Sequence, residues 1–185
     1  MSRVLHLIRH GMPAPDPQKP SHEWELAPGA LAGLPDLIAT LHPHPGVVVS
    51  SEEPKAAATA QALAQALSVP CHRMLGLHEQ LRYTVPFYAQ PGELQAQIGR
   101  FFAHSAEVVF GEESADLARE RFTAALRAVM TTHPQGCVAV VTHGTVRSLY
   151  VAQANNLEAP TLWQQQTLLD VLSVEWPSGK LSKRS

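Results

Sequence analysis

Three short, mostly apolar runs constrain the fold of this chain more than any other feature. They lie at residues 3–8, 47–49 and 137–142. Strands of a parallel sheet that is covered on both faces have this character, because neither face of such a strand meets water. Stretches with a helical spacing of apolar residues separate the runs, at residues 30–41, 54–67, 93–103 and 114–132. The pattern predicts an α/β fold with a mostly parallel sheet.

Several details of these elements can be predicted as well. Pro35 is expected to shorten or kink the first helix, whereas Pro54 suits the first turn of the second. In the helix at 114–132, the residues expected to face the core are Leu117, Phe122, Leu126 and Val129. The remaining expectations are a strand at 69–75, a loop at 83–92, a helix after Gly144 and a last, edge strand at 171–176. Because the chain shows no repeat or linker, we expect residues 1–185 to form one domain, a three-layer α/β/α sandwich.

The composition restricts the kinds of partner to be expected. The 185 residues include 14 basic and 16 acidic ones without a block of like charge, and the formal net charge is −2. That balance favours neither nucleic acid nor a membrane as partner. No apolar stretch approaches the roughly 20 residues that span a bilayer, and the N-terminal run is too short and charged for a signal peptide. We expect a cytoplasmic protein whose two cysteines, Cys71 and Cys137, are buried and reduced.

Polar residues follow each apolar run where the predicted strand ends. These endings are Arg9-His10-Gly11, Ser50-Ser51 and Thr142-His143-Gly144. Ligands bind beyond the carboxyl ends of parallel strands, so neighbouring strands would bring His10 and His143 together. Glycine leaves a backbone N–H open to an anion, and the helix that starts near Lys55 directs its N-terminus at the same region. The sequence therefore predicts a phosphate-binding site.

Five segments carry a resemblance to a known family. They read LIRHG near the N-terminus, SSEEPKAAATA in the middle, GLHEQL around Glu79, GEES at 111–114 and VVTHG late in the chain. In this order they resemble the histidine phosphatase superfamily, the phosphoglycerate mutase-like proteins. The resemblance extends from Val4 to about Leu149. It implies a phosphoglycerate mutase-like fold and a reaction that needs neither a metal nor another cofactor.

The resemblance also implies roles for the matching residues. His10 would attack phosphorus through one ring nitrogen, while a backbone carbonyl holds the other. The phosphoryl oxygens would be bound by Arg9, Lys55 and His143, with backbone N–H groups near Gly11 and Gly144. Glu79 would protonate the leaving oxygen and then activate water, with Glu23, Glu25 and Glu113 as substitutes. The expected protein is a histidine acid phosphatase-type phosphomonoesterase that acts on a small phosphorylated substrate.

Two departures from the family pattern bear on rate and substrate. Lys55 stands where the family usually has arginine, so the charge is kept but the planar fork is lost. After RHG the chain continues with Met12-Pro13 and then Asp16, where the family often has an acidic-threonine pair and an asparagine. A carboxylate at Asp16 would repel phosphate unless it points away.

Three alternatives stay open. The first is a phosphoglycerate mutase-type phosphotransferase. The short stretch between Glu79 and Gly111 argues against it, because it leaves little chain to enclose a substrate. The second is a catalytically weak phospho-ligand binding or regulatory protein on the same scaffold. The third is a metallohydrolase that uses histidines, for which His42 and His44 are the nearest candidates, although no HExxH motif accompanies them.

The remaining histidines and aromatic residues admit simpler interpretations. His6 is expected to be a packed or sheet-face residue. The expected solvated histidines are His22, His42, His44, His72, His78, His104 and His133. Tyr83, Phe87 and Tyr88 either line a lid over the substrate or pack as core. Loop residues at 12–24 and 83–92 are expected to set the specificity.

Overall fold

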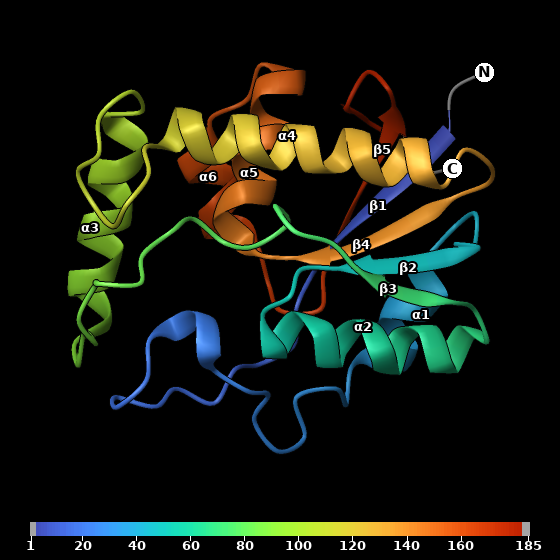
Figure 1. Ribbon diagram of the computed structural model, residues 1–185, viewed down its shortest axis with the longest axis horizontal. Coiled ribbons are helices and arrows are strands. Elements are labelled where there is room, and N and C mark those ends of the chain that lie inside the picture. Colours follow the sequence, from blue (N-terminus) through green and yellow to red (C-terminus); the bar gives the residue numbers. More distant parts are fainter. Residues whose placement is uncertain (1–2, 183–185) are drawn as a thin grey trace.

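The three apolar runs form adjacent parallel strands in the computed structural model (Figure 1). The structure describes residues 3–182, and for Pro91 it describes only the backbone. They are β1 (Arg3–Arg9), β2 (Val47–Ser50) and β4 (Val138–Thr142). The strand order is β3-β2-β4-β1-β5-β6, so β4 lies between the other two. In the ladders, Val140 of β4 pairs with Leu7 of β1 on one side and with Val49 of β2 on the other. The prediction of a mostly parallel sheet is confirmed.

The two margins of the sheet differ from the prediction. On one side β3 (Cys71–Arg73) extends the parallel part, and it is shorter than the strand expected at 69–75. On the other side β5 (Val171–Trp176) runs antiparallel to β1. The prediction of β5 as the edge strand is wrong, because the chain turns back at Gly179, whose φ is +69°, and adds β6 (Lys180–Leu181) outside it.

Helices cover both faces of the sheet and make a three-layer, single-domain α/β fold. Leu5 and Leu7 contact the cluster that includes α4 (Ala115–Thr132) and α5 (Gly144–Asn155). Ile8 belongs to the opposite cluster, with α1 (Leu34–Thr40) and α2 (Pro54–Leu67). Figure 1 shows α4 and α5 on one side of the strands and α1 and α2 on the other. The strands are therefore buried on both faces, which agrees with their mostly apolar sequences.

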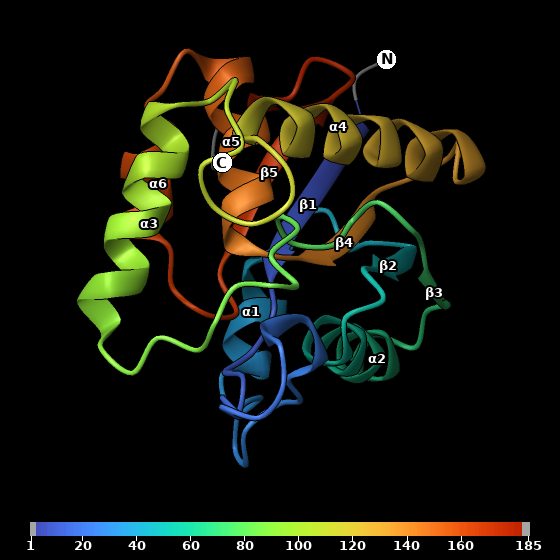
Figure 2. The ribbon, with the colours of Figure 1, turned by 60° about the vertical axis from the view of Figure 1, so that its left-hand side comes forward.

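Two further helices stand outside these layers, beyond the carboxyl ends of the parallel strands. They are α3 (Pro91–Ala103) and α6 (Ala159–Gln165). Figure 2 shows α3 and α6 side by side, and their residues are in contact. The sequence predicted α3 nearly to its ends, whereas α6 and the short 3-10 helix at Ser21–Glu23 were not predicted. These segments surround the region where the strands end.

The predicted helices hold in most details. Pro35 lies in the first turn of α1, where its fixed φ is tolerated, so the helix begins at Leu34 rather than at residue 30. The expectation that Leu117 faces the core is wrong, because its side chain is 54% exposed. The buried face of α4 instead follows the 3.6-residue repeat through Ala118, Phe122 and Val129, and Leu117 lies about a quarter turn away from it.

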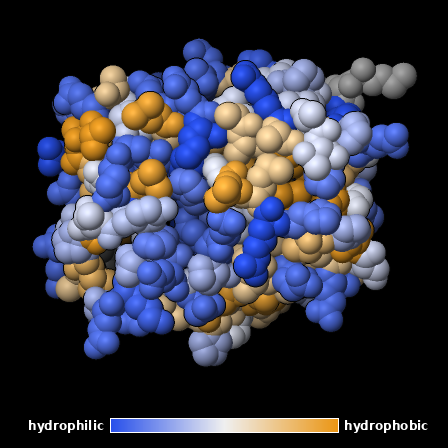
Figure 3. Space-filling model, viewed as in Figure 1, coloured by the Kyte–Doolittle hydropathy of each residue, from blue (hydrophilic) through white to orange (hydrophobic). Residues whose placement is uncertain are grey.

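Smaller expectations concern the two cysteines, His6 and the helices. Both cysteines are free, Cys137 buried and Cys71 half-buried. His6 is fully buried in the sheet and is hydrogen-bonded to Ser173 and to the carbonyl of Pro43, as expected for a packed histidine. Within residues 3–182, no helix is both long and apolar enough to cross a bilayer. On the face shown in Figure 3, small groups of hydrophobic residues lie between hydrophilic ones.

Candidate active site

A cavity of about 220 Å³ lies where β1, β2 and β4 end. Arg9 pairs with Thr142 in the β1–β4 ladder, so the residues that follow them, His10 and His143, emerge side by side. Their ring centroids are 5.1 Å apart. Of the residues predicted for the site, those that line this cavity are Arg9, His10, Lys55, Glu79, His143 and Gly144. The strand ends and the segments that follow them thus bring together residues from four distant parts of the sequence.

His10 is held in one tautomer by its own backbone. Its Nδ1 lies 2.7 Å from the carbonyl oxygen of Gly11, which can only accept, so Nδ1 carries the proton and Nε2 the lone pair. Burial lowers the pKa of His10 to about 4, and the Lys55 and Arg9 cations act in the same direction. The Gly11 carbonyl opposes that shift without reversing it. His10 is therefore a neutral imidazole at neutral pH, the form that a nucleophile needs.

His143 is almost fully buried beside the end of β2. Its Nε2 lies 2.7 Å from Ser51 Oγ and 3.5 Å from a carboxylate oxygen of Glu53. Burial holds the pKa of His143 well below its usual value, and the Lys55 cation adds to the effect. Its Nδ1 has no hydrogen-bond partner among the described residues. A buried ring nitrogen without a partner is costly, and a ligand in the cavity would relieve that cost.

Arg9 supplies a further cation to the cavity that His10 and His143 line. Its Nη1 donates to the carbonyl of Gln166 at 3.4 Å, whereas its buried Nε has no partner within residues 3–182. The absence of a side chain at Gly144 leaves room for the Arg9 side chain, because a Cβ at residue 144 would lie 3.3 Å from Gln166 Oε1 and 3.4 Å from Arg9 Nε. The guanidinium thus keeps most of its five donors for an anion.

Lys55 is buried and forms an ion pair with Glu53, a residue that the sequence analysis did not single out. Lys55 Nζ donates to Glu53 Oε2 at 2.5 Å and to the carbonyl of Ser21 at 2.7 Å. Glu53 Oε1 also accepts from the backbone N–H of Glu79 at 2.8 Å. An ammonium has three protons, so Lys55 has one left for a phosphoryl oxygen.

Glu79 lies at the N-terminus of α5. Its carboxylate accepts from the backbone N–H groups of Thr145 at 3.1 Å and Val146 at 3.3 Å, and it lies 3.4 Å from Arg82. Burial alone would raise the pKa of Glu79, but Arg82, His143 and the N–H donors outweigh it and hold the pKa below its usual value. Glu79 is therefore ionised at neutral pH.

Gly11 does not line the cavity. Its backbone N–H donates to Thr59 Oγ1 at 3.0 Å, so this group is already occupied. A glycine is nevertheless required there, because a Cβ would lie only 2.9 Å from the carbonyl oxygen of Ala30. The structure thus assigns Gly11 to the close packing of the loop and, through its carbonyl, to His10.

The comparisons with known proteins establish the family of this chain. The sequence matches the family model of the histidine phosphatase superfamily (branch 1) over residues 5–183. The chain belongs to this superfamily. A search of curated proteins found no match.

Solved structures with the same fold include several phosphatases. A mycobacterial glucosyl-3-phosphoglycerate phosphatase is 16% identical, with a TM-score of 0.73 and coverage of 96% of this chain and 93% of that one. For an Entamoeba histolytica phosphoserine phosphatase in complex with 3-phosphoglyceric acid, the identity is 17%, the TM-score 0.74, and the coverage 99% and 95%. The Bacillus stearothermophilus protein YhfR is 17% identical, with a TM-score of 0.71 and coverage of 97% and 94%. At these identities the likeness establishes the fold.

In this histidine phosphatase superfamily member, the outer wall of the cavity comes from α3 and from short segments with little sequence periodicity. The wall is formed by Trp24, Tyr83, Leu94, Ile98 and Trp163. His22 also lines the cavity, and its ring lies 4.2 Å from that of Tyr83. Of the histidines expected to be solvated, His22, His78 and His133 are half-buried. Of the three candidate lid residues, Tyr83 lines the cavity. Phe87 is exposed near Trp24, and Tyr88 packs against the core.

The carboxylates that were considered as substitutes for Glu79 lie elsewhere. Glu113 forms an ion pair with Arg121 at 2.5 Å, Glu25 is exposed, and neither lines the cavity. Glu23 is exposed and lines a neighbouring hollow. Asp16 does not line the cavity, and its carboxylate accepts from the backbone N–H of Gln18 at 2.9 Å. We therefore expect no direct repulsion between Asp16 and a bound phosphate.

The histidines considered as metal ligands lie apart from this cavity. His42 and His44 have ring centroids 5.4 Å apart, and no carboxylate or cysteine joins them in a group of three. Elsewhere in residues 3–182, no group of three histidine, cysteine, aspartate or glutamate residues is placed to hold a metal ion.

Proposed function

We propose that this protein is a metal-independent phosphomonoesterase that hydrolyses a small phosphorylated metabolite through a phosphohistidine on His10. One observation carries the proposal. The Gly11 carbonyl fixes the proton of His10 on Nδ1, so that the lone pair of Nε2 is free beside Arg9 and His143. Membership of the superfamily and the phosphatase names of similar structures support the same class of reaction.

In the first step, His10 Nε2 attacks phosphorus, and the bond from phosphorus to the ester oxygen breaks. Arg9, His143 and the third proton of Lys55 bind the phosphoryl oxygens, whose charge is redistributed during transfer. The leaving oxygen takes its electron pair from the broken bond and its proton from Glu79. The product of this step is a free alcohol and a phosphohistidine.

Glu79 must carry a proton for that step, although it is ionised in the free protein. The proton arrives with the substrate, because a phosphate monoester has a second pKa near 6 and its charge beside Glu79 raises the pKa of the carboxyl group. In the second step, the Glu79 carboxylate accepts a proton from water while the water oxygen attacks phosphorus. The bond to nitrogen breaks, and the electron pair returns to His10.

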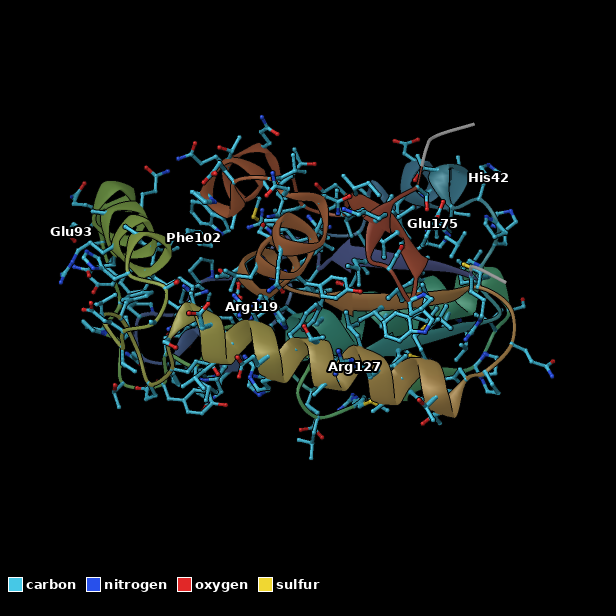
Figure 4. The ribbon with its side chains drawn as sticks, turned by 90° about the horizontal axis from the view of Figure 1, so that it is seen from above. His42, Glu93, Phe102, Arg119, Arg127 and Glu175 are labelled. Carbon is cyan, nitrogen blue, oxygen red and sulfur yellow. The ribbon has the colours of Figure 1, made fainter. Side chains whose placement is uncertain are left out.

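Hydrolysis of p-nitrophenyl phosphate in the presence of EDTA tests this proposal. The wild type is expected to turn over, and His10→Ala is expected to lose all measurable activity. His42→Ala is the matched control, since His42 is an exposed histidine remote from the cavity and on the opposite side of the molecule from Glu93 of α3 (Figure 4). Activity that survives in His10→Ala, or that disappears with EDTA, would contradict the proposal.

A second candidate is a phospho-ligand binding protein on the same scaffold. The Glu53 carboxylate favours it, since it offsets the charge of Lys55 and lies 3.5 Å from His143. This candidate predicts that vanadate and phosphate bind in the cavity while a screen of phosphorylated metabolites gives no turnover.

A further inference from the structure

We propose that the cavity selects phosphomonoesters whose leaving group is uncharged and carries an aromatic or apolar ring, and that it discriminates against leaving groups with a carboxylate or a second phosphate. This inference rests on the proposed phosphatase function and names the substrate class of the same site. Two independent properties of the cavity carry it: the pairing of its charges, and the chemistry of the wall beyond the phosphate.

The charges that line the cavity are almost all paired within the protein. Lys55 is paired with Glu53 at 2.5 Å and Arg82 with Glu79 at 3.4 Å. Among the described residues, Arg9 is the one lysine or arginine of the lining that has no carboxylate partner. When protonated, His22 has the Glu23 carboxylate 3.6 Å away.

This pairing leaves little positive charge for a substrate. Three cations and two carboxylates line the cavity, so its net charge is one positive unit when the histidines are neutral. A phosphate monoester carries nearly two negative charges at neutral pH. A second anionic group on the same substrate would therefore be desolvated without a cation to bind it, which is unfavourable.

The wall beyond the phosphate is apolar and aromatic. Trp24 lines the cavity from the loop after β1 and Trp163 lines it from α6, and Tyr83 is a third aromatic residue of the lining. Leu94 and Ile98 of α3 add aliphatic surface. Flat aromatic side chains bind rings by stacking and by burial of apolar area.

A second hollow of about 420 Å³ continues this wall between α3 and α6. It shares Arg9, Ile98 and Trp163 with the first cavity, and its other polar side chains are the amides Gln95, Gln164 and Gln166. Phe102, whose ring centroid is 6.4 Å from that of Trp163, lies on the side of α3 toward α6, whereas Glu93 lies on the outer side (Figure 4). With volumes of 220 and 420 Å³, the two hollows together reach the size of typical small-molecule sites, roughly 300–1,000 Å³. Apart from Arg9, the second hollow thus offers a ligand only uncharged hydrogen-bonding side chains, those of its glutamines.

Two non-hydrolysable phosphonates of nearly the same shape test the proposal directly. Benzylphosphonate carries an uncharged ring, and 4-carboxybenzylphosphonate adds one carboxylate to it. We expect the carboxylate to weaken binding by at least about tenfold, since it would be buried unpaired. Equal or tighter binding of the carboxylated compound, or no binding of either, would overturn the proposal. The affinities are measured by calorimetry with the wild type, and the result does not depend on turnover because phosphonates are not hydrolysed.

Variants of the wall give a second measurement. The ratio to measure is the dissociation constant of 4-carboxybenzylphosphonate divided by that of benzylphosphonate. Leu94→Lys places a cation beside the ring, and we expect it to lower this ratio by about tenfold relative to the uncharged control Leu94→Met. Trp163→Ala is expected to weaken the binding of benzylphosphonate more than the binding of methylphosphonate, which has no ring. If neither variant changes these ratios, the substrate class is wrong. If p-nitrophenyl phosphate is not hydrolysed but the ratios behave as expected, the proposed phosphatase function fails and the ligand class stands.

Discussion

The Glu53 carboxylate and the Lys55 ammonium form an ion pair inside the cavity, with Oε2 and Nζ 2.5 Å apart. Glu53 precedes the first turn of α2 and Lys55 lies within it, so the start of the helix brings the two side chains together. Both residues are buried, at 8% and 5% exposure. Removal of one partner would leave the other as a buried charge without its counter-ion.

Lys55→Met is therefore expected to lower the free energy of unfolding by about 3–5 kcal/mol, because Glu53 is left buried without its cation. The double variant Glu53→Gln with Lys55→Met should recover most of that loss, since the two effects are coupled. Urea denaturation of the wild type, both single variants and the double variant measures the coupling. Additive losses in the double variant would show that the pair does not act as a unit.

The stability of the protein should fall as the medium becomes acidic, in part because of His10. Its pKa is about 4 in the folded state and 6.5 in the unfolded reference, so the unfolded chain binds the proton first as the pH falls below 6.5. The free energy of unfolding then decreases until the folded state also titrates near pH 4, and the contribution of His10 is roughly 3 kcal/mol.

The measurement is urea denaturation from above pH 6.5 down to pH 4, with wild type and His10→Asn. Asparagine keeps a donor near the position of Nδ1 but does not titrate. The variant should therefore show a shallower loss of stability with acid. His6 and His143 also have lowered pKa values, so some acid sensitivity remains. Identical pH profiles would contradict a buried, neutral His10.

Gly144→Ala should reduce activity while it leaves the fold intact. The added Cβ would meet Gln166 Oε1 at 3.3 Å and Arg9 Nε at 3.4 Å. Gln166 cannot easily move, because its Oε1 accepts from Arg147 Nη2 at 2.5 Å. The added Cβ would press on Gln166, whose carbonyl accepts from Arg9 Nη1, and a guanidinium displaced with it is expected to lower kcat/KM by roughly tenfold. Gly92→Ala is the control, because a Cβ there meets nothing within 4 Å.

Glu79→Gln should distinguish substrates by their leaving group. An alkyl phosphate releases a basic alkoxide that needs a proton, and its rate of phosphoryl transfer should fall by about 100-fold to 10,000-fold. p-Nitrophenolate leaves without a proton, so the release of the first equivalent of nitrophenol should be nearly unchanged. Glu25→Gln, which alters an exposed carboxylate, serves as the control. An equal loss on both substrates would assign Glu79 a structural role.

The centre of the site could be predicted because it follows from the strands. A buried run that ends in a polar residue fixes both the strand and the position of that residue, so the proximity of His10 and His143 could be inferred once the strands were taken as parallel neighbours. The same reasoning from strand ends predicted that Arg9 and the N-terminus of α2 lie at this edge of the sheet. The edge of the sheet could not be inferred in this way, since β6 has only two residues, Lys180 and Leu181, and no pattern of its own.

Glu53 and the aromatic wall could not be predicted for different reasons. In the sequence Glu53 is one of two adjacent glutamates before a helix, and only the fold shows that Glu52 is exposed while Glu53 is buried against Lys55. The two-residue spacing from Glu53 to Lys55 across a helix start was the available signal. Trp24 and Trp163 lie in short segments without periodicity, and their position depends on tertiary contacts.

The most direct test of the whole account is to trap the covalent intermediate. The wild type is mixed rapidly with p-nitrophenyl phosphate and quenched in alkali, in which phosphohistidine survives, and the peptide that contains His10 is analysed by mass spectrometry. The account predicts a phosphoryl group on His10, absent after an acid quench and absent in His10→Asn. Turnover without a phosphoryl group on His10, or with one on another residue, would contradict it.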